Sequence, residues 1–154
     1  MTDTAEIKGC VIRKDLYYRV ADHTWVKVED GGTVVVGMTD VAQNMAGELL
    51  HAKVKKAGTV REKGRPIATV ESSKWVGPVK TPVSGEIIEV NEKVQQDATL
   101  INKSPYDEGW LVRIKPSALE AELSEMATGD AAVEAYRQKF ETENLKACKE
   151  LEAV

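Results

Sequence analysis

The sequence predicts a mainly β fold: a β sandwich with one short internal helix and two α-helices at the C-terminus. Residues 1–115 alternate short strand-like segments with turns. Two units of similar pattern, residues 58–71 and 85–94, place β-branched residues after a glycine, which suggests two related halves of a sandwich. After Pro116 the chain is rich in Ala, Glu, Leu and Lys and contains no further proline, a composition typical of helices.

The predicted strands either alternate apolar and polar residues or form short apolar runs between turn residues. In chain order they are DLYYRV (15–20), TWVKVED (24–30), TVVVGM (33–38) and LLHAKVK (49–55). Gly31 and Gly32 predict a turn between the second and the third of these strands. The internal helix is DVAQNMAGEL (40–49), with Thr39 or Asp40 as its N-cap.

The C-terminal part predicts two helices, separated by a break at residues 128–130. The first is SALEAELSEMA (117–127), with Ser117 as its expected N-cap and Glu120 at the capping-box position. The second covers residues 130–154, and its apolar face contains Val133, Tyr136, Phe140, Ala147 and Leu151. We therefore expect one β domain, residues 1–116, with residues 117–154 as a helical extension packed on it.

Composition argues against several classes of function. The chain of 154 residues has a formal net charge of −4 and 5% aromatic residues, whereas nucleic-acid binding uses clustered basic residues and stacking aromatics. The first ten residues lack the apolar region of a secretory signal, and the longest strongly apolar run, residues 34–36, is too short to span a membrane. A cytoplasmic location is therefore expected.

The cysteines and histidines do not form a recognisable site. Cys10 and Cys148 lie near opposite ends of the chain, without the spacing of a zinc site, so free thiols are expected, with a redox role as the alternative. His23 and His51 have no partner at catalytic or metal-binding spacing. Because the sequence also shows no nucleophile beside a base and no phosphate-binding loop, we do not expect an enzyme or a metal site.

Lys74 occupies an unusual position between two strand-like runs. One predicted strand ends at Val70–Glu71 and the next begins near Pro82–Val83. The intervening residues would hold Lys74 at the tip of a β-hairpin, with Gly64 and Gly85 at the opposite end. A lysine displayed on a rigid β platform can be distinguished by a modifying enzyme from the other lysines of the chain.

Five stretches identify a resemblance to the H-protein family of the glycine cleavage system. They follow the family's order and are DHTWV (22–26), VGMTDVAQNMAGE (36–48), VESSKW (70–75), PVSGEIIEVN (82–91) and LINKSPYDEGWLVRIKP (100–116). The resemblance implies a lipoyl/biotinyl-type β sandwich, also called a barrel-sandwich hybrid. It also implies that residues 1–116 form an H-protein-like lipoyl carrier domain.

The resemblance further implies that Lys74 carries lipoic acid through an amide bond. Biotin is less favoured, because the related biotin carriers flank their lysine with methionines, whereas Lys74 lies between Ser73 and Trp75. Glu71 and Gly85 are expected to shape the presentation of Lys74 rather than to do chemistry. The implied partners are a lipoate ligase or other lipoylating enzyme, dihydrolipoyl dehydrogenase, and the enzymes that load and unload the arm.

The sequence departs from the family's usual pattern at two acidic positions. Thr24 stands where the family has a glutamate, and Pro78 where it has an aspartate. A patch with Lys53, Lys55 and Lys56 would also suit an acidic partner or an anion better than a cation.

These departures favour a carrier of sulfur-bound intermediates. Such a chain resembles the lipoate-binding proteins that work beside the heterodisulfide-reductase-like complex in the oxidation of reduced sulfur. Two alternatives remain open: a glycine cleavage H protein that shuttles an aminomethyl group, and an unmodified H-like interaction protein that docks through its charged C-terminal helix.

Overall fold

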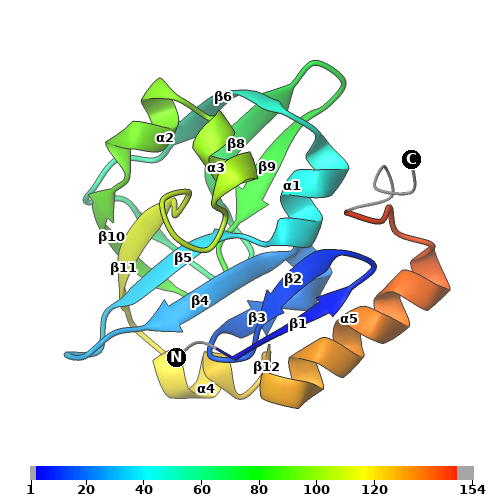
Figure 1. Ribbon diagram of the computed structural model, residues 1–154. Coiled ribbons are helices and arrows are strands. Elements are labelled where there is room, and N and C mark those ends of the chain that lie inside the picture. Colours follow the sequence, from blue (N-terminus) through cyan, green and yellow to red (C-terminus); the bar gives the residue numbers. More distant parts are fainter. Residues whose placement is uncertain (1–2, 149–154) are drawn as a thin grey trace.

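Three antiparallel sheets form the framework of the computed structural model, which describes residues 3–148 (Figure 1). In spatial order, the seven-stranded sheet contains β12 (Ala127–Thr128), β3 (Tyr17–Arg19), β4 (Thr24–Val28), β5 (Val34–Met38), β11 (Val112–Pro116), β10 (Gly85–Val90) and β7 (Val60–Arg61). The three-stranded sheet contains β6 (Leu49–Val54), β8 (Pro66–Ser72) and β9 (Val76–Lys80). A separate hairpin joins β1 (Thr4–Ile7) to β2 (Cys10–Arg13).

The two larger sheets share one apolar core. The strands β4, β5, β10 and β11 contribute fully buried side chains such as Val26, Val36 and Ile87, and β6, β8 and β9 contribute others such as Val70. In the three-stranded sheet, residues that face this core alternate with exposed ones apart from local bulges. Strand β5 is buried on both faces, because Val35 belongs to a second apolar core on the other side of the seven-stranded sheet. The prediction of a mainly β sandwich is confirmed.

The internal helix α1 (Asp40–Ala46) begins where the sequence predicts it. The Thr39 hydroxyl accepts a hydrogen bond from the backbone N–H of Ala42 at 3.1 Å, so Thr39 rather than Asp40 is the N-cap. Gly47 ends the helix with a φ of 85°, a conformation that favours glycine.

Three short helical segments were not predicted: the 3₁₀ turn η1 (Val20–Asp22) and the helices α2 (Glu92–Gln96) and α3 (Thr99–Lys103). Each has five residues or fewer, which is too short for an amphipathic period to be visible. Helices α2 and α3 cover the outer edge of β6, where Gln95 Oε1 accepts from Val54 N and Asn102 Oδ1 accepts from Leu49 N, both at 2.8 Å.

The first C-terminal helix is shorter than expected. Helix α4 spans Leu119–Leu123, and its N-cap position is Ala118, so Ser117 does not cap it. The backbone N–H of Ser117 instead donates to the Ser84 carbonyl at 3.0 Å. The carboxylate of Glu122 anchors the helix by accepting hydrogen bonds from the backbone N–H and the hydroxyl of Ser84, at 2.7 and 2.6 Å. The short strand β12, which pairs with β3, ends at Thr128, inside the break expected at residues 128–130.

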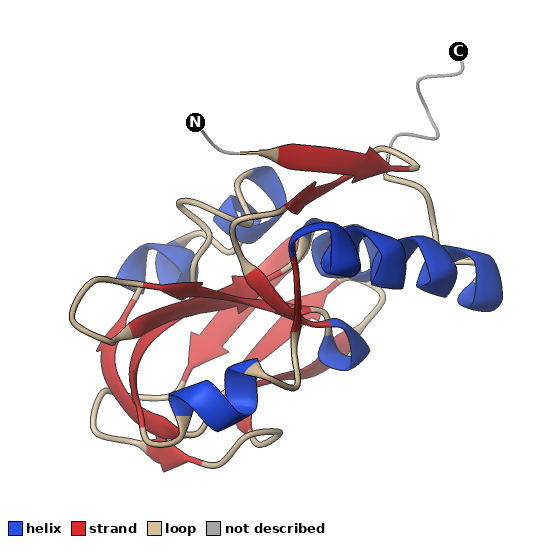
Figure 2. Ribbon diagram, turned by 90° about the horizontal axis from the view of Figure 1, so that it is seen from below, coloured by secondary structure: helices blue, strands red, loops and turns tan. Residues whose placement is uncertain are grey.

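The second C-terminal helix, α5 (Gly129–Glu143), packs beside the β1–β2 hairpin (Figure 2). Its buried residues include Val133, Tyr136 and Phe140, as predicted, and they contact a second apolar core that contains Trp25. The helix ends at Asn144, which has a left-handed φ of 52°, so Ala147 lies beyond it. Leu151 lies outside the described residues.

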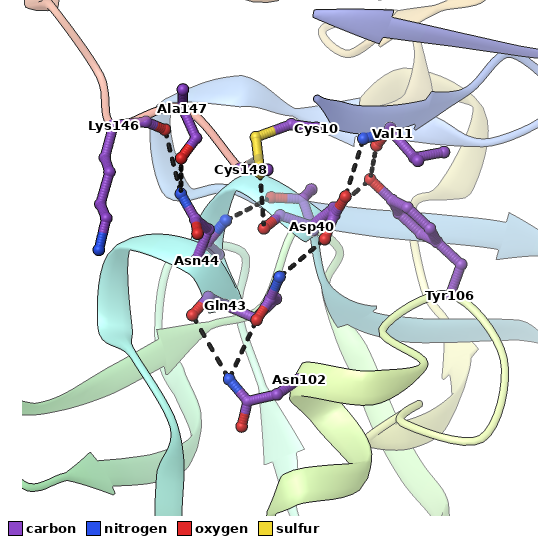
Figure 3. The surroundings of a disulfide bond; sticks show 12 residues. Cys10, Val11, Asp40, Gln43, Asn44, Asn102, Tyr106, Lys146, Ala147 and Cys148 are labelled. Atoms are coloured by element: carbon purple, nitrogen blue, oxygen red, sulfur yellow. Dashed lines mark hydrogen bonds between the residues drawn. A yellow bond between two sulfur atoms is a disulfide. The ribbon is translucent and has the colours of Figure 1, made fainter. Parts of the chain in front are cut away.

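A disulfide joins Cys10 to Cys148, so the expectation of two free thiols is wrong (Figure 3). The segment after α5 turns back toward α1, where the side-chain amide of Asn44 donates to the carbonyls of Lys146 and Ala147 at 3.1 Å. The backbone N–H of Cys148 donates to the Lys8 carbonyl at 2.9 Å. These contacts place the two cysteines 5.0 Å apart between Cα atoms, although 138 positions separate them in the sequence.

Replacing Cys148 should destabilise the oxidised protein. Because the cross-link closes a loop of 138 positions, Cys148→Ser should lower the free energy of unfolding by about 2–5 kcal/mol. Urea denaturation followed by tryptophan fluorescence measures the loss. In the presence of a strong thiol reductant, the variant and the wild type should differ by much less. An equally large difference under reducing conditions would show that the side chain, not the bond, matters.

Candidate functional site

Lys74 lies at the tip of the β8–β9 hairpin. Only Ser73, Lys74 and Trp75 separate the two strands, and the hairpin closes where the backbone N–H of Ser72 donates to the Trp75 carbonyl at 2.7 Å. The Ser72 hydroxyl, which is almost completely buried, accepts from the backbone N–H of Lys74 at 3.3 Å. The lysine side chain is exposed on a short, hydrogen-bonded loop.

The prediction that the second strand of this hairpin begins near Pro82 is wrong. Strand β9 begins at Val76 and includes Gly77 and Pro78, two residues that disfavour strands. Pro78 is tolerated because β9 pairs only with β8 and is an edge strand, where a missing N–H disrupts no second ladder.

Two glycines that the sequence analysis missed make room for the residues at the tip. A Cβ atom on Gly47 would lie 2.9 Å from Cε of Lys74, and one on Gly77 would lie 2.4 Å from the ring of Trp75. The stem of Lys74 therefore rests on the end of α1, and the indole of Trp75 rests on its own strand. The sequence did not indicate that Gly47 lies beside Lys74, because the two residues are far apart in the chain.

A cavity of about 470 Å³ opens beside Lys74, within the range of sites for small ligands. Its wall is mostly apolar and comes from α1, β5 and the hairpin. The lining residues are Asp22, His23, Met38, Ala42, Met45, Ala46, Lys74, Trp75, Pro78 and Val79.

Asp22 brings a carboxylate to the wall of the cavity. Its Oδ2 atom lies 2.7 Å from Nε of Arg19, and its side chain is 17% exposed. Within residues 3–148 the buried Oδ2 makes this ion pair but accepts no hydrogen bond, so the carboxylate can accept one from a cation. Asp22 was not predicted as a site residue from the sequence, although it lies in the DHTWV stretch, beside His23.

His23 lines the same cavity and is neutral. Burial, together with the positive charge of Lys139, lowers the pKa of its imidazole to about 4. Its Nδ1 atom lies 3.2 Å from the Tyr136 hydroxyl, and the two rings stack with centroids 5.8 Å apart. Helix α5 thereby supports the cavity from outside.

The two positions where the acids of the family are replaced lie in different surroundings. Pro78 lines the cavity, as expected for a residue close to the arm. Thr24 is fully buried on β4, does not line the cavity, and has no hydrogen-bond partner for its hydroxyl within residues 3–148. The structure therefore links only Pro78 directly to the neutral surface near Lys74.

Glu71 and Gly85, the other candidate residues, are not brought together. Glu71 is exposed on β8, opposite Val76 and His51 in the neighbouring strands, close to the tip. Gly85 begins β10 in the other sheet, where a Cβ atom would lie 2.2 Å from the Lys115 carbonyl oxygen. Gly85 thus allows two strands to approach each other, and its effect on Lys74 stays a prediction.

Metal and membrane sites find no support in the described part of the chain. Residues 3–148 contain no group of three or more His, Cys, Asp or Glu side chains that could hold a metal ion. Among the described helices, none has the length and apolar character needed to cross a membrane.

An exposed lysine at the tip of a short hairpin, beside a mostly apolar cavity, defines a carrier of a covalently attached arm. Residues 16–139 match the family model described as glycine cleavage H-protein. The chain belongs to the glycine cleavage H-protein family.

Similar proteins cover most of the chain. A protein of Aquifex aeolicus named glycine cleavage system H protein 3 is 49% identical over 139 residues, covering 88% of this chain and 86% of the relative. A probable glycine cleavage system H protein 2 of Saccharolobus solfataricus is 45% identical over 145 residues, covering 93% and 97%. The crystal structure of a glycine cleavage system H protein from Mycobacterium marinum superposes with a TM-score of 0.65 at 32% identity, covering 74% of this chain and 98% of that one.

Membership of the family decides two expectations. Its members are non-catalytic carrier proteins, so the chain is a carrier and not an enzyme. They carry a lipoyl group on a lysine, so the expected cofactor is confirmed as lipoic acid.

The low pKa of His23 should make stability depend on pH. The folded pKa of about 4 lies below the ordinary value of 6.5, so the unfolded chain binds the proton more readily. The stabilisation is complete above pH 6.5 and is lost as the pH falls toward 4. NMR of the imidazole should therefore show a neutral ring at pH 6.

His23→Gln should show a weaker dependence of the unfolding free energy on pH between 6.5 and 4. Tyr136→Phe is the control and should keep the pH dependence of the wild type. It removes the hydroxyl but keeps the burial of His23, which is the main cause of the low pKa. An imidazole that titrates between pH 6 and 7 in the wild type would contradict the assignment.

Proposed function

We propose that Lys74 carries the lipoyl group and that the chain shuttles an aminomethyl group in glycine decarboxylation. The observation that carries the proposal is the exposed Lys74 beside a cavity that contains the carboxylate of Asp22. The names of its relatives, glycine cleavage system H proteins, favour the same function.

The residues around Lys74 fit an acylated lysine. No ion pair holds its ammonium group within residues 3–148, so forming an amide would break no existing charge pair. The cavity of about 470 Å³ is large enough for a flexible acyl arm. When bound, the lipoyl group supplies a disulfide that can accept two electrons or take a group on one sulfur.

The chain itself positions, shelters and balances charge. Ser72 holds the backbone of Lys74, and Gly47 lets its stem lie at the end of α1, at the mouth of the cavity. The side chains of Met38, Met45 and Trp75 exclude water from the cavity wall. Asp22 supplies negative charge where a cationic cargo would lie, because a sheltered cation without a counter-charge is costly. This carboxylate partly makes up for the two acids of the family that Thr24 and Pro78 replace.

The proposed partners follow from this cycle. A lipoylating enzyme would recognise Lys74 with Glu71 close by, glycine cleavage enzymes would load and unload the arm, and dihydrolipoyl dehydrogenase would reoxidise it. Gly85 would contribute only by keeping β10 and β11 in close contact.

A second candidate is the carriage of sulfur-bound intermediates for a heterodisulfide-reductase-like complex. It is favoured by the presence of Pro78 in place of an acid on the cavity wall, and by the pairing of the one lining carboxylate, Asp22, with Arg19. A neutral thiol adduct would not need an acidic site.

Lys74→Arg should abolish lipoylation without unfolding the protein, because arginine keeps the charge but lacks the primary amine. After co-expression with lipoylating enzymes, the intact mass of the wild type should rise by one lipoyl group, and that of the variant should not. Lys80→Arg on the same hairpin is the matched control and should be modified normally. A wild type that stays unmodified would support the unmodified interaction protein instead.

Asp22→Asn should lower the rate of carbon dioxide exchange with glycine decarboxylase about tenfold, the effect of losing one charge-assisted hydrogen bond. The exposed Asp30, changed in the same way, is the control and should have no effect. Negligible exchange by the lipoylated wild type would reject glycine decarboxylation and favour the sulfur candidate. Normal exchange by Asp22→Asn would reject the role of this carboxylate.

A further inference from the structure

The outer face of the three-stranded sheet bears lysines along its two outer strands, β6 and β9. Inward side chains such as Ala52 and Val79 are buried, whereas alternate residues point to solvent. The exposed residues, called here the lysine face, are His51, Lys53 and Lys55 on and just after β6, Thr69 and Glu71 on β8, and Val76, Pro78 and Lys80 on β9.

The register of the strands fixes the order of these residues. Glu71 pairs with His51 and with Val76 in the row nearest the hairpin tip. Thr69 pairs with Lys53 and with Pro78 in the next row, about 7 Å further away. Lys80 pairs with Pro66, and the backbone N–H of Lys55 donates to Ile67, in the row beyond.

The lysines of this face have no acidic partners. Within residues 3–148, Lys53, Lys55 and Lys80 form no ion pair, whereas Lys14, Lys63 and Lys139 each contact a carboxylate. Glu71 is the one acid among the residues of the lysine face. A positive face therefore lies on a chain whose formal net charge is −4.

We propose that the lysine face docks an acidic surface of a protein that acts on the arm of Lys74. The inference rests on the proposed function, because it assumes that enzymes visit this lysine. Charge complementarity selects an acidic surface and raises the rate of encounter. The β8–β9 hairpin carries Lys74 and part of the lysine face, so a partner seated on Thr69, Val76 and Pro78 would hold the arm at high effective concentration.

Other anionic partners fit this face less well. Three lysines would neutralise about three phosphates, which gives weak and strongly salt-dependent binding to nucleic acid. An anionic membrane surface would contribute about 1 kcal/mol for each lysine, and the face offers no amphipathic helix to insert. A sheet surface whose lysines flank Thr69, Val76 and Pro78 instead suits a folded protein surface.

The test compares two triple variants of the lipoylated chain. The face variant is Lys53→Gln, Lys55→Gln and Lys80→Gln. The control variant is Lys27→Gln, Lys93→Gln and Lys103→Gln, which removes the same charge from exposed lysines elsewhere. Intact mass establishes equal lipoylation, and thermal denaturation establishes equal folding.

The probes are glycine decarboxylase, followed by carbon dioxide exchange, and dihydrolipoyl dehydrogenase, followed by oxidation of the reduced arm. With at least one of these, the face variant should show kcat/KM about tenfold below wild type at low salt, and a weaker dependence on ionic strength. The control variant should stay within about twofold of wild type.

The docking proposal would be overturned by equal losses in both variants, or by no loss in the face variant with either enzyme. It would also be overturned if both reactions stayed normal and the wild type bound anionic vesicles or duplex DNA at 0.15 M salt. In that case the face variant alone would lose this binding. Failure of the proposed function gives a different pattern, because a lipoylated wild type would then be inactive with glycine decarboxylase itself. Full activity of the face variant rejects the docking surface and leaves the carrier function standing.

Discussion

The position of the reactive lysine depends on how tightly the β8–β9 hairpin closes. A backbone hydrogen bond of 2.7 Å between Ser72 and Trp75 closes the turn around Ser73 and Lys74, and the buried Ser72 hydroxyl accepts a hydrogen bond from the backbone N–H of Lys74. Because Ser72 belongs to the sandwich core and Gly47 ends α1, the lysine is fixed to both at once. The cavity wall, the exposed face of the sheet and the stem of Lys74 therefore keep one geometry.

The electrostatics of the site come from a small number of side chains. Burial keeps His23 neutral, and Asp22 is partly balanced by Arg19, so the cavity has a weak negative charge in a mostly apolar wall. Thr24 is buried and does not line this wall, so a carboxylate placed there would lose its hydration.

Local patterns were sufficient to predict much of the fold. Strands β3, β4, β5 and β6, the Thr39 cap and the buried face of α5 follow from alternation, capping chemistry and helical period, whereas β11 and β12 were not predicted. Strand β9 was missed because Gly77 and Pro78 resemble a turn, and their strand conformation depends on an edge position that only the tertiary structure defines. Asp22 and Gly47 were missed because the chain brings them to Lys74 from distant positions, and the disulfide because residues 138 positions apart leave no spacing pattern. Since disulfides are rare in a reducing cytoplasm, the cytoplasmic location stays an expectation.

The disulfide also changes what a cut in the backbone would do. Residues 10–148 form a closed covalent ring, so that a protease acting at an exposed turn such as Gly31–Gly32 would open the ring without releasing a fragment. The two pieces would stay joined through sulfur and through the strands on either side of the cut, β4 and β5, which pair with each other. A nicked molecule would then keep Lys74 in place, and its two pieces would separate only after the disulfide is reduced.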